Sequence, residues 1–260
     1  MNILQITLIE KAGYDNGFEN AESINPQRVE LSSSRHPTHA QVTQDKGSST
    51  YRINLEQAPV SLMVELQREF SSENESGLFL CENEAQLHRF LRRAAALSRA
   101  LPNQAVNDYL VLVADELAKL PAAITGTEVE RMVRQRVGQN KYRSAMLDYW
   151  GGACAVTGVQ ITELLRASHA LPWAECQSDA QRLDVFNGFL LSANLDALFD
   201  RFLISFDSQG QILFGPSIDL KQLVSIGIES NMRLRWLDAK HELYLEYHRK
   251  RTISEKNNII

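Results

Sequence analysis

The stretch from Gly151 to Gly210 constrains the fold of this 260-residue chain more than any other part of it. The apolar run from Leu164 to Pro172 predicts an extended segment that carries His169 and ends at the proline. Asn187-Gly188 is a strong turn dipeptide, and the apolar residues 189–191 after it predict a short buried strand. We therefore expect two short strands joined by a loop.

A helix is expected directly after these strands. Ala193 to Arg201 has apolar residues at helical spacing, with Asp196 and Asp200 four residues apart. Their carboxylates should share one helical face, where two like charges repel each other unless a cation lies between them. Oxygen ligands suit a hard divalent cation, so we expect Mg²⁺, with Mn²⁺ or another divalent ion as the alternative.

The residues His169, Asn187, Asp196 and Asp200 together suit the hydrolysis of a phosphodiester bond. This reaction needs an activated water and a charge sink for the phosphate and its leaving oxygen. A neutral imidazole can take the proton, because its pKa lies near physiological pH. A metal on the two aspartates can stabilise the charge, and the Asn187 amide is expected to hold the His169 ring in its productive orientation.

The same stretch resembles the HNH, or ββα-metal, nuclease motif of bacterial restriction-type proteins. The resemblance covers about residues 130–215 and includes a preceding helical segment as well as the strands and helix above. The matching segments are Gln139–Arg143, Gly151–Gly158, Ser168–Trp173, Asn187–Leu191 and Asp196–Asp200. This resemblance implies a ββα-metal fold and a metal-dependent endonuclease that cuts double-stranded DNA.

The resemblance also implies a role for each candidate residue. His169 matches the general base of the family, and Asn187 matches the middle asparagine of its name. Asp196 matches the last histidine, which binds metal in the family, and Asp200 matches a further metal ligand that some members place one helical turn later.

Two departures from the family pattern bear on the metal sites. Ser168 stands where many members have Asp or His just before the base, so the third protein ligand is open. Members with a structural zinc have two CxxC pairs, whereas this chain keeps only Cys154, with Thr157, Ser192 and Leu195 at the other three positions. We therefore expect no structural zinc.

The charge pattern points to local phosphate contact. A net charge of -5 argues against an indiscriminate nucleic-acid binder, but the stretch from Glu130 to Arg143 carries five basic residues and one acidic residue. A solvated helix face explains such a stretch equally well. The candidate DNA-binding residues are Arg134, Arg136, Lys141 and Arg143.

Composition gives expectations about location. No run of about 18 apolar residues is present, and the N-terminus lacks a basic segment before its apolar residues, so we expect neither a membrane span nor a signal peptide. Cys81, Cys154 and Cys176 are far apart and form no CxxC pair, which fits a reducing compartment. We expect a cytoplasmic protein.

The N-terminal half has no motif with a clear chemistry. Alternation predicts strands over Asn2–Ile9, Arg28–Leu31 and Tyr51–Leu55. The loop Ser32–His39 carries Arg35, His36 and His39, which could read DNA or lie in an ordinary connection. Ala58–Phe70 is ambiguous between helix and strand.

Three helices are expected to follow this half. Asn83 is a candidate N-cap for the first, whose apolar stripe contains Leu87, Phe90, Leu91, Ala94 and Leu97. The second spans Ala105–Leu120, and Thr127 with Glu130 predicts a capping box for the third. We place a domain boundary within residues 121–126. The expected architecture is α+β: a mixed strand and helix domain over residues 1–122, then a nuclease domain over residues 123–260 with its core motif at 151–210.

The sequence therefore predicts a DNA endonuclease of restriction or defence type, with dependence on modified bases left open. Residues 1–122 would choose the DNA, and two-fold DNA favours a homodimer. Two alternatives remain: a DNA-binding protein that keeps the HNH fold but is catalytically weakened, and a defence nuclease whose first half binds a signal. Whether one strand or both are cut stays open.

Overall fold

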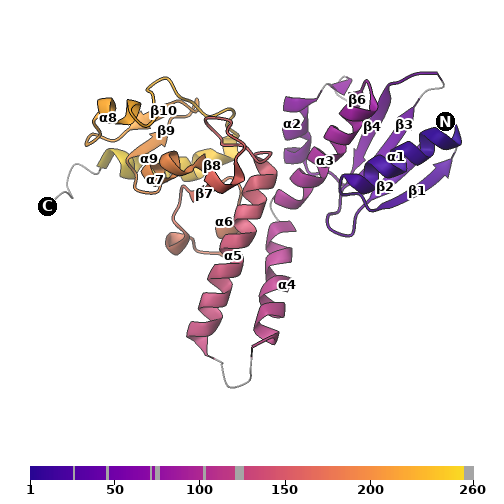
Figure 1. The fold of residues 1–260 in the computed structure, drawn as a ribbon. Coiled ribbons are helices and arrows are strands. Elements are labelled where there is room, and N and C mark those ends of the chain that lie inside the picture. The colour runs from indigo at the N-terminus through magenta and orange to yellow at the C-terminus, as the bar shows by residue number, and fades with distance from the viewer. Residues whose placement is uncertain are drawn as a thin grey trace. The chain divides into compact units, whose positions relative to one another are not determined.

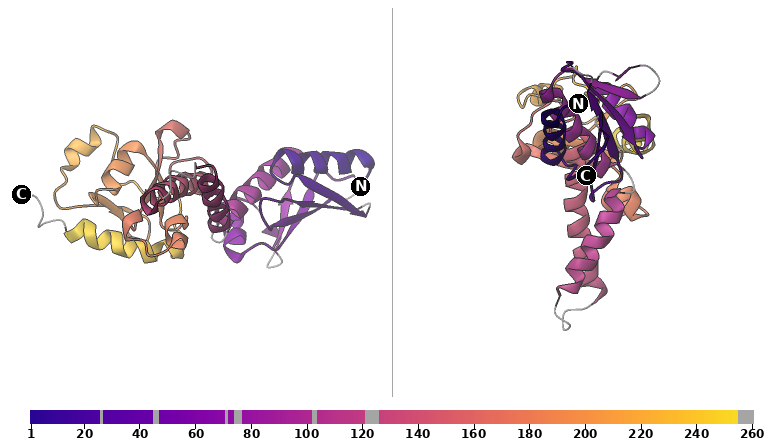
Figure 2. Two further views of the ribbon diagram at one scale, coloured as in Figure 1. Left: turned by 90° about the horizontal axis from the view of Figure 1, so that it is seen from below. Right: turned by 90° about the vertical axis from the view of Figure 1, so that its right-hand side faces the viewer.

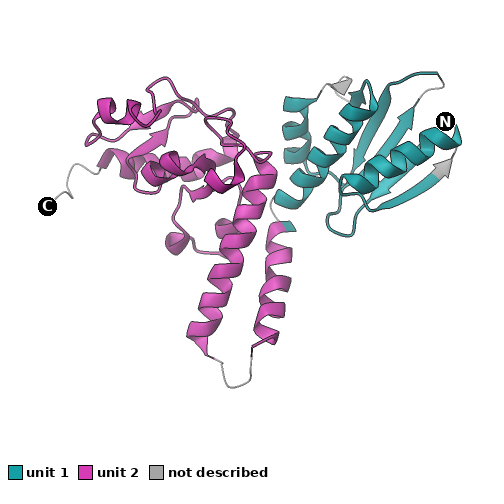
Figure 3. Cartoon of the chain, viewed as in Figure 1, with its two compact units in different colours: residues 1–104 teal, residues 105–260 magenta. Residues whose placement is uncertain are grey.

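The computed structural model describes residues 1–25, 27–44, 47–70, 72–73, 77–101, 104–120 and 126–254. It divides into two compact units, Met1–Gln104 and Ala105–Ile260 (Figure 3). Helices and strands occur in both units, so the expected α+β class is confirmed. The boundary between the units falls after residue 104, one helix before the boundary expected within residues 121–126. Residues 121–125 lie outside the described residues.

The first unit is built on an antiparallel sheet with the strand order β1-β2-β3-β4-β6-β5 (Figure 1). Val29, Leu31, Ala40, Val42 and Ile53 alternate with polar residues along its central strands and are fully buried. This alternation gives the sheet one apolar face and one polar face. The strands are β1 (Asn20–Asn25), β2 (Arg28–Ser32), β3 (His39–Gln44), β4 (Tyr51–Glu56), β5 (Ser72–Glu73) and β6 (Leu78–Cys81).

Three helices belong to this unit: α1 (Ile3–Asp15), α2 (Val60–Glu69) and α3 (Glu84–Ala100). They lie together along one face of the sheet (Figure 2). The N-cap at Asn83 is confirmed, because its side chain accepts a hydrogen bond from the Gln86 amide. The expected apolar stripe of this helix is also confirmed, since all five of its residues are fully buried.

The strand expected over Asn2–Ile9 is wrong, because this segment forms most of α1. Asn2 caps the helix, and its side chain and that of Gln5 form a reciprocal capping box. Ile3 and Leu4 are exposed, whereas Ile9 is buried. The apolar residues of this segment therefore do not mark the buried face of a strand. The helix packs closely on the sheet at Gly13, where an added Cβ would lie 2.7 Å from a Leu31 methyl carbon.

The loop before β3 resolves one open alternative. The His36 ring is buried and bonds through Nε2 to the Gly17 carbonyl oxygen at 3.1 Å. His36 therefore holds a loop together. His39 begins β3 and lies 3.0 Å from the carboxylate of Glu30 on β2.

The second unit begins with two helices, α4 (Gln104–Ala118) and α5 (Thr127–Tyr149). Tyr109 and Glu116 of α4 bond to α5, which explains why α4 groups with the C-terminal unit. The capping box expected at Thr127 is wrong, because Gly126 is the N-cap residue and provides no side-chain oxygen. Thr127 is instead the first residue of the helix.

A ββα arrangement follows, made of β7 (Leu165–His169), β8 (Gly188–Ser192) and α7 (Ala193–Phe199). An antiparallel pair of strands comes next, β9 (Ile204–Phe206) and β10 (Ile212–Phe214). Helix α9 (Glu242–Ser254) ends the described part of this unit. The shorter helices are η2 (Thr162–Leu164), η3 (Trp173–Glu175), α6 (Asp179–Leu183), α8 (Leu220–Val224) and η4 (Ala239–His241).

Candidate active site

Strands β7 and β8 pair so that His169 lies opposite Gly188 and Ser168 lies opposite Phe189. Gly188 has φ +144°, and a Cβ built on it would lie 1.8 Å from the Ser168 carbonyl oxygen. No side chain fits at that distance. The glycine of the Asn-Gly turn therefore permits the close approach that places His169 beside the loop between the strands.

Three groups fix the imidazole of His169. The Tyr142 ring of α5 stacks on it, with 3.8 Å between ring centroids and 21° between ring planes. The Trp173 ring meets it edge to face at 5.8 Å. Nε2 lies 2.9 Å from the Arg182 carbonyl oxygen, which can only accept a hydrogen bond. Nε2 must therefore carry the hydrogen, which leaves Nδ1 as a proton acceptor.

Burial sets the protonation state of this histidine. It lowers the pKa of His169 to about 4, although the Arg182 carbonyl and the negative charge of Asp200 act in the opposite direction. The imidazole is consequently neutral at neutral pH, as a general base must be before it acts.

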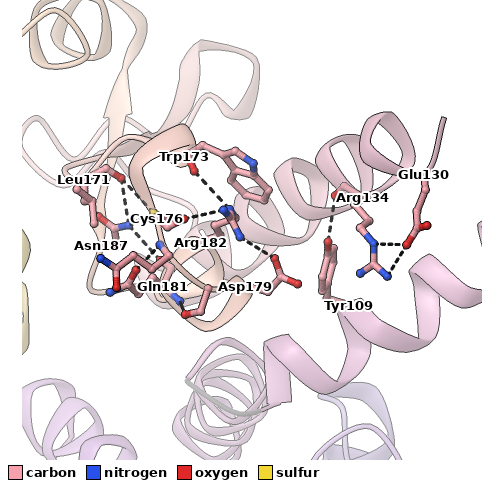
Figure 4. A network of polar contacts seen from close by, with 12 residues as sticks. Tyr109, Glu130, Arg134, Leu171, Trp173, Cys176, Asp179, Gln181, Arg182 and Asn187 are labelled. Atoms are coloured by element: carbon pink, nitrogen blue, oxygen red, sulfur yellow. Dashed lines mark hydrogen bonds and ion pairs between the residues drawn. The ribbon is translucent and has the colours of Figure 1, made fainter. Parts of the chain in front are cut away.

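Asn187 is fully buried and braces the loop rather than the ring. Its Oδ1 accepts a hydrogen bond from the Leu171 amide at 2.8 Å, and its Nδ2 donates to the Gln181 carbonyl at 3.0 Å (Figure 4). The expected contact with the His169 ring is replaced by the Arg182 carbonyl, one residue beyond Gln181. Asn187 therefore affects the histidine through the backbone of this loop.

Tyr142 is a site residue to which the sequence assigned no role. Besides stacking on His169, its hydroxyl donates hydrogen bonds to the backbone oxygens of Asn187 at 2.9 Å and Ser168 at 3.3 Å. It therefore ties helix α5 to both strands of the ββα arrangement. Its position within the matching segment Gln139–Arg143 was a usable indication that the tyrosine belongs to the site.

The two aspartates lie at the start and end of a single turn of α7. The Asp200 amide donates to the Asp196 carbonyl oxygen at 2.8 Å, which fixes the expected one-turn spacing. The Ser168 hydroxyl donates to the Asp196 carboxylate. Burial raises the pKa of Asp196, the Ser168 hydrogen bond lowers it, and the charge of Asp200 raises it further.

These aspartates share a pocket of about 440 Å³ with His169, Ser168 and Trp173. The described residues contain no group of three or more His, Cys, Asp or Glu side chains that could hold a metal ion. The donor set still fits a hard divalent cation, because two carboxylates one turn apart supply oxygen ligands and Mg²⁺ usually keeps several waters. The raised pKa of Asp196 also marks a place where added positive charge would be stabilising.

The four basic candidates on α5 all make contacts within the protein. Arg134 pairs with Glu130 of the same helix. Arg136 and Lys141 pair with carboxylates of α4. Arg143 donates to the backbone oxygens of Leu165 and Thr162, and it is the one of these four that lines the pocket of His169.

Arg166 is a further basic residue at this pocket that sequence reasoning missed. It is exposed and lies on β7 two residues before Ser168, so both project to one side of the strand. Its positive charge, with that of Arg201, lowers the pKa of Asp196. The two-residue spacing from Ser168 was the available indication in the sequence.

The thiol of Cys154 joins three of the four positions that carry a structural zinc in some members of the family. Cys154 is fully buried, and its sulfur accepts hydrogen bonds from the backbone amides of Thr157 at 3.4 Å and Ser192 at 3.3 Å. Cys176 is also buried, and burial raises the pKa of its thiol.

Helix α9 contacts residues next to two parts of the site. Its Tyr244 hydroxyl donates to the Asp184 carboxylate at 2.9 Å, just before Asn187. Its His248 ring stacks on Phe199 at 3.8 Å and bonds through Nε2 to the Phe199 carbonyl oxygen at 3.0 Å, next to Asp200. Burial lowers the pKa of His248 to about 4, so it is neutral at neutral pH.

A half-buried histidine on one strand and two aspartates on the following helix thus share one pocket of a ββα arrangement. Residues 154–207 match the family model of HNH endonucleases, which supports an HNH assignment for this part of the chain and indicates a nuclease or DNA-binding function. HNH nucleases generally use divalent metal ions. A search of curated proteins found no match to the chain. In the part of the chain that the structure describes, no helix combines the length and apolar character needed to cross a bilayer.

Proposed function

We propose that this protein is a metal-dependent DNA endonuclease of restriction or defence type. The observation that carries the proposal is the state of His169: Nε2–H donates to the Arg182 carbonyl, Nδ1 is left as an acceptor, and the residue lines the same pocket as Asp196 and Asp200. A base and a cation site in one pocket are what phosphodiester hydrolysis needs.

In the proposed mechanism, His169 Nδ1 takes a proton from a water molecule while the water oxygen forms a bond to phosphorus. The bond from phosphorus to the leaving 3′ oxygen breaks, and that oxygen keeps the electron pair. Asp196 and Asp200 would hold a divalent cation, Mg²⁺ in our proposal, which supplies charge stabilisation for the phosphate and the leaving oxygen. Because burial disfavours the imidazolium, His169 then returns the proton to solvent readily.

We also propose that basic side chains contact the phosphates of the DNA backbone. These are Arg143 and Arg166 at the pocket, and Arg134, Arg136 and Lys141 elsewhere on α5. The last three are in ion pairs, of which those of Arg134 and Arg136 are exposed to solvent and therefore weak, whereas Lys141 is largely buried. A DNA phosphate can therefore replace the carboxylate partner of Arg136 at small cost. Such binding should weaken steeply as salt concentration rises.

The test is cleavage of supercoiled plasmid with Mg²⁺ or Mn²⁺ by wild type, His169→Ala and Glu246→Gln. We expect His169→Ala to bind DNA normally and to cut at least 100-fold more slowly, the lower range for loss of a general base. Glu246→Gln, which changes an exposed residue of α9, should cut like wild type. Equal cutting by His169→Ala and wild type would overturn the proposal.

One observation favours a second candidate, a DNA-binding protein that no longer cuts. The Ser168 hydroxyl occupies one oxygen of Asp196, at the position where a stronger ligand is common in the family. Titration calorimetry with Mn²⁺ distinguishes the two candidates. Binding to wild type that is lost in Asp196→Ala but kept in Asp115→Asn, an exposed control on α4, supports the nuclease. An absence of Mn²⁺ binding to wild type supports the second candidate.

For the first unit we propose DNA recognition, with modified bases as one class of target. For the whole chain we propose a homodimer, because one site cuts one strand and duplex DNA has two-fold symmetry. Cleavage of methylated and unmethylated plasmids tests the first proposal, and equal rates would contradict dependence on modification. Sedimentation with and without DNA tests the second, and a monomer that only nicks would contradict it.

A further inference from the structure

A second pocket, of about 580 Å³, lies beside the proposed active site in the C-terminal unit. Its lining comes from Tyr109 of α4, from the N-terminal half of α5 and from the loop that contains Trp173 and Arg182. Trp173 also lines the pocket of His169, so the two pockets share a wall. The volume lies within the range of about 300 to 1,000 Å³ that is usual for small-molecule sites.

The shared wall depends on a glycine within α5. A Cβ built at Gly138 would lie 2.3 Å from Cη2 of Trp173. Glycine weakens the interior of a helix, and here its absence of a side chain lets the indole lie directly against α5. Arg182 covers the indole from another side, with its Cζ 5.7 Å from the ring centroid. The Trp173 ring is thus held in a defined place.

The polar groups of this second pocket alternate in charge. Asp179 and Arg182 form one ion pair at 3.0 Å, and Glu130 and Arg134 form another at 2.8 Å (Figure 4). Figure 4 shows the first pair on the Trp173 loop and the second, with Tyr109, on the side of α4 and α5. A third arginine of the lining, Arg131, pairs with Glu128. Acceptors beside donors match the edge of a nucleobase, which carries amino groups and carbonyl oxygens.

We propose that this pocket receives an unstacked nucleobase of the DNA, close to the phosphate that is cut. The aromatic ring of Trp173 provides the stacking surface, and the two ion pairs provide hydrogen bonds to the base edge. From Arg131 in this pocket to Gln139 in the other, α5 advances about 12 Å at 1.5 Å per residue. This equals three to four steps of about 3.4 Å along one strand of B-DNA. The inference rests on the proposed nuclease function.

The test uses duplexes that carry 2-aminopurine, a fluorescent base, at each of the six positions on either side of the cut. His169→Ala protein holds the duplex without cutting it. We expect the fluorescence to change on binding at one position, two to five nucleotides from the cut. Adding Trp173→Ala should abolish that change and weaken binding roughly tenfold, the effect expected for loss of one stacked base. Trp173→Phe should restore both.

Two further variants keep the proposal falsifiable if Trp173→Ala fails to fold. Glu130→Gln removes one carboxylate from the pocket and should change which base is bound best. Lys119→Ala, an exposed control directly after α4, should leave the fluorescence unchanged. Cleavage of DNA without a fluorescence change at any position would overturn the inference and leave the nuclease intact.

A free nucleotide carries the same base and is the alternative ligand for this pocket. Titration with dAMP, dGMP, dCMP and dTMP separates it from a base of the DNA strand. Displacement of the 2-aminopurine duplex from this pocket by a nucleotide at millimolar concentration supports the inference. Tight nucleotide binding without any fluorescence change in the duplex would overturn it. If wild type cuts no DNA under any condition, the proposed function itself fails.

Discussion

The candidate site has two halves, the histidine and the two aspartates, and they differ in how many protein contacts fix them. His169 lies under Tyr142, beside Trp173 and on the Arg182 carbonyl, and burial keeps it neutral. In contrast, Asp200 is exposed at the end of α7, and Asp196 has a hydrogen bond from Ser168. The histidine is therefore fixed by the protein itself, whereas the carboxylates have fewer contacts and would gain order from the proposed cation.

This difference follows from what each half has to do. A base must present one nitrogen to a water molecule, so its orientation has to be set by the protein. Carboxylates that bind a hard cation need charge and some freedom to adjust their geometry. Variants should therefore affect the two halves differently: damage around His169 should cost folding and rate together, and changes around Asp196 should act mainly through the metal.

The largest effect is expected at Gly188. Gly188→Ala places a Cβ against the Ser168 carbonyl at a positive φ, so β7 and β8 must separate. We expect a loss of about 3 kcal/mol or more in the free energy of unfolding, and no detectable cutting. Thermal unfolding and plasmid cleavage measure the two effects. Gly158→Ala is the control, since Gly158 also has positive φ but its Cβ would meet no atom within 4 Å. If both variants behave alike, the close approach of the strands does not hold the base.

The next effect concerns pH. Burial lowers the pKa of His169 and of His248 to about 4, against about 6.5 in an unfolded chain. Between these values the unfolded state binds more protons, so stability is full above about pH 6.5 and falls as the pH drops toward 4. Asp184 and Asp196 oppose this fall, because burial raises their pKa. Urea unfolding at pH 7.5, 6.0 and 4.5 measures the sum, a few kcal/mol if the histidines dominate.

Replacing either histidine separates the two contributions to this pH dependence. His248→Phe keeps a ring against Phe199 and should flatten the curve without moving the base. His169→Phe should flatten it by a similar amount. If the pH dependence is the same in wild type and in both variants, the two histidine rings are not held neutral by burial.

That His169, Asp196 and Asp200 would lie close together could be predicted from the sequence, because turn and helix signals occur at fixed spacing around them. The ββα arrangement around His169, Asp196 and Asp200 follows from a turn dipeptide and two apolar runs. The partner of the His169 ring could not be predicted, because it is a backbone carbonyl and every residue has one. The strand expected over Asn2–Ile9 was wrong for a different reason. The apolar residues of this segment fit the spacing of a strand as well as that of a helix, and the capping box at Asn2 favours the helix.

Tyr142→Phe should separate orientation from anchoring on the base side. The variant keeps the ring that stacks on His169 but removes the hydroxyl that bonds to the backbone of Ser168 and Asn187. We expect a loss of about 1 to 3 kcal/mol in the free energy of unfolding, with kcat within a few-fold of wild type. Tyr142→Leu should also lower kcat, and Tyr14→Phe, at an exposed tyrosine, should change neither quantity. A large fall in kcat for Tyr142→Phe would show that the hydroxyl, rather than the stacked ring, orients the base.

The smallest effect is expected on the carboxylate side, in Ser168→Asp. A third carboxylate beside Asp196 adds repulsion, which should lower the Tm when no metal is present. The same charge adds an oxygen ligand, so calorimetry should show Mn²⁺ binding about tenfold more tightly, or about 1.4 kcal/mol. The Tm should then rise with Mn²⁺ concentration more than in wild type. Ser208→Asp, on an exposed turn, controls for added charge alone. Unchanged Mn²⁺ affinity in Ser168→Asp would mean that the carboxylate half is as fixed as the base, and that the cation lies away from Ser168.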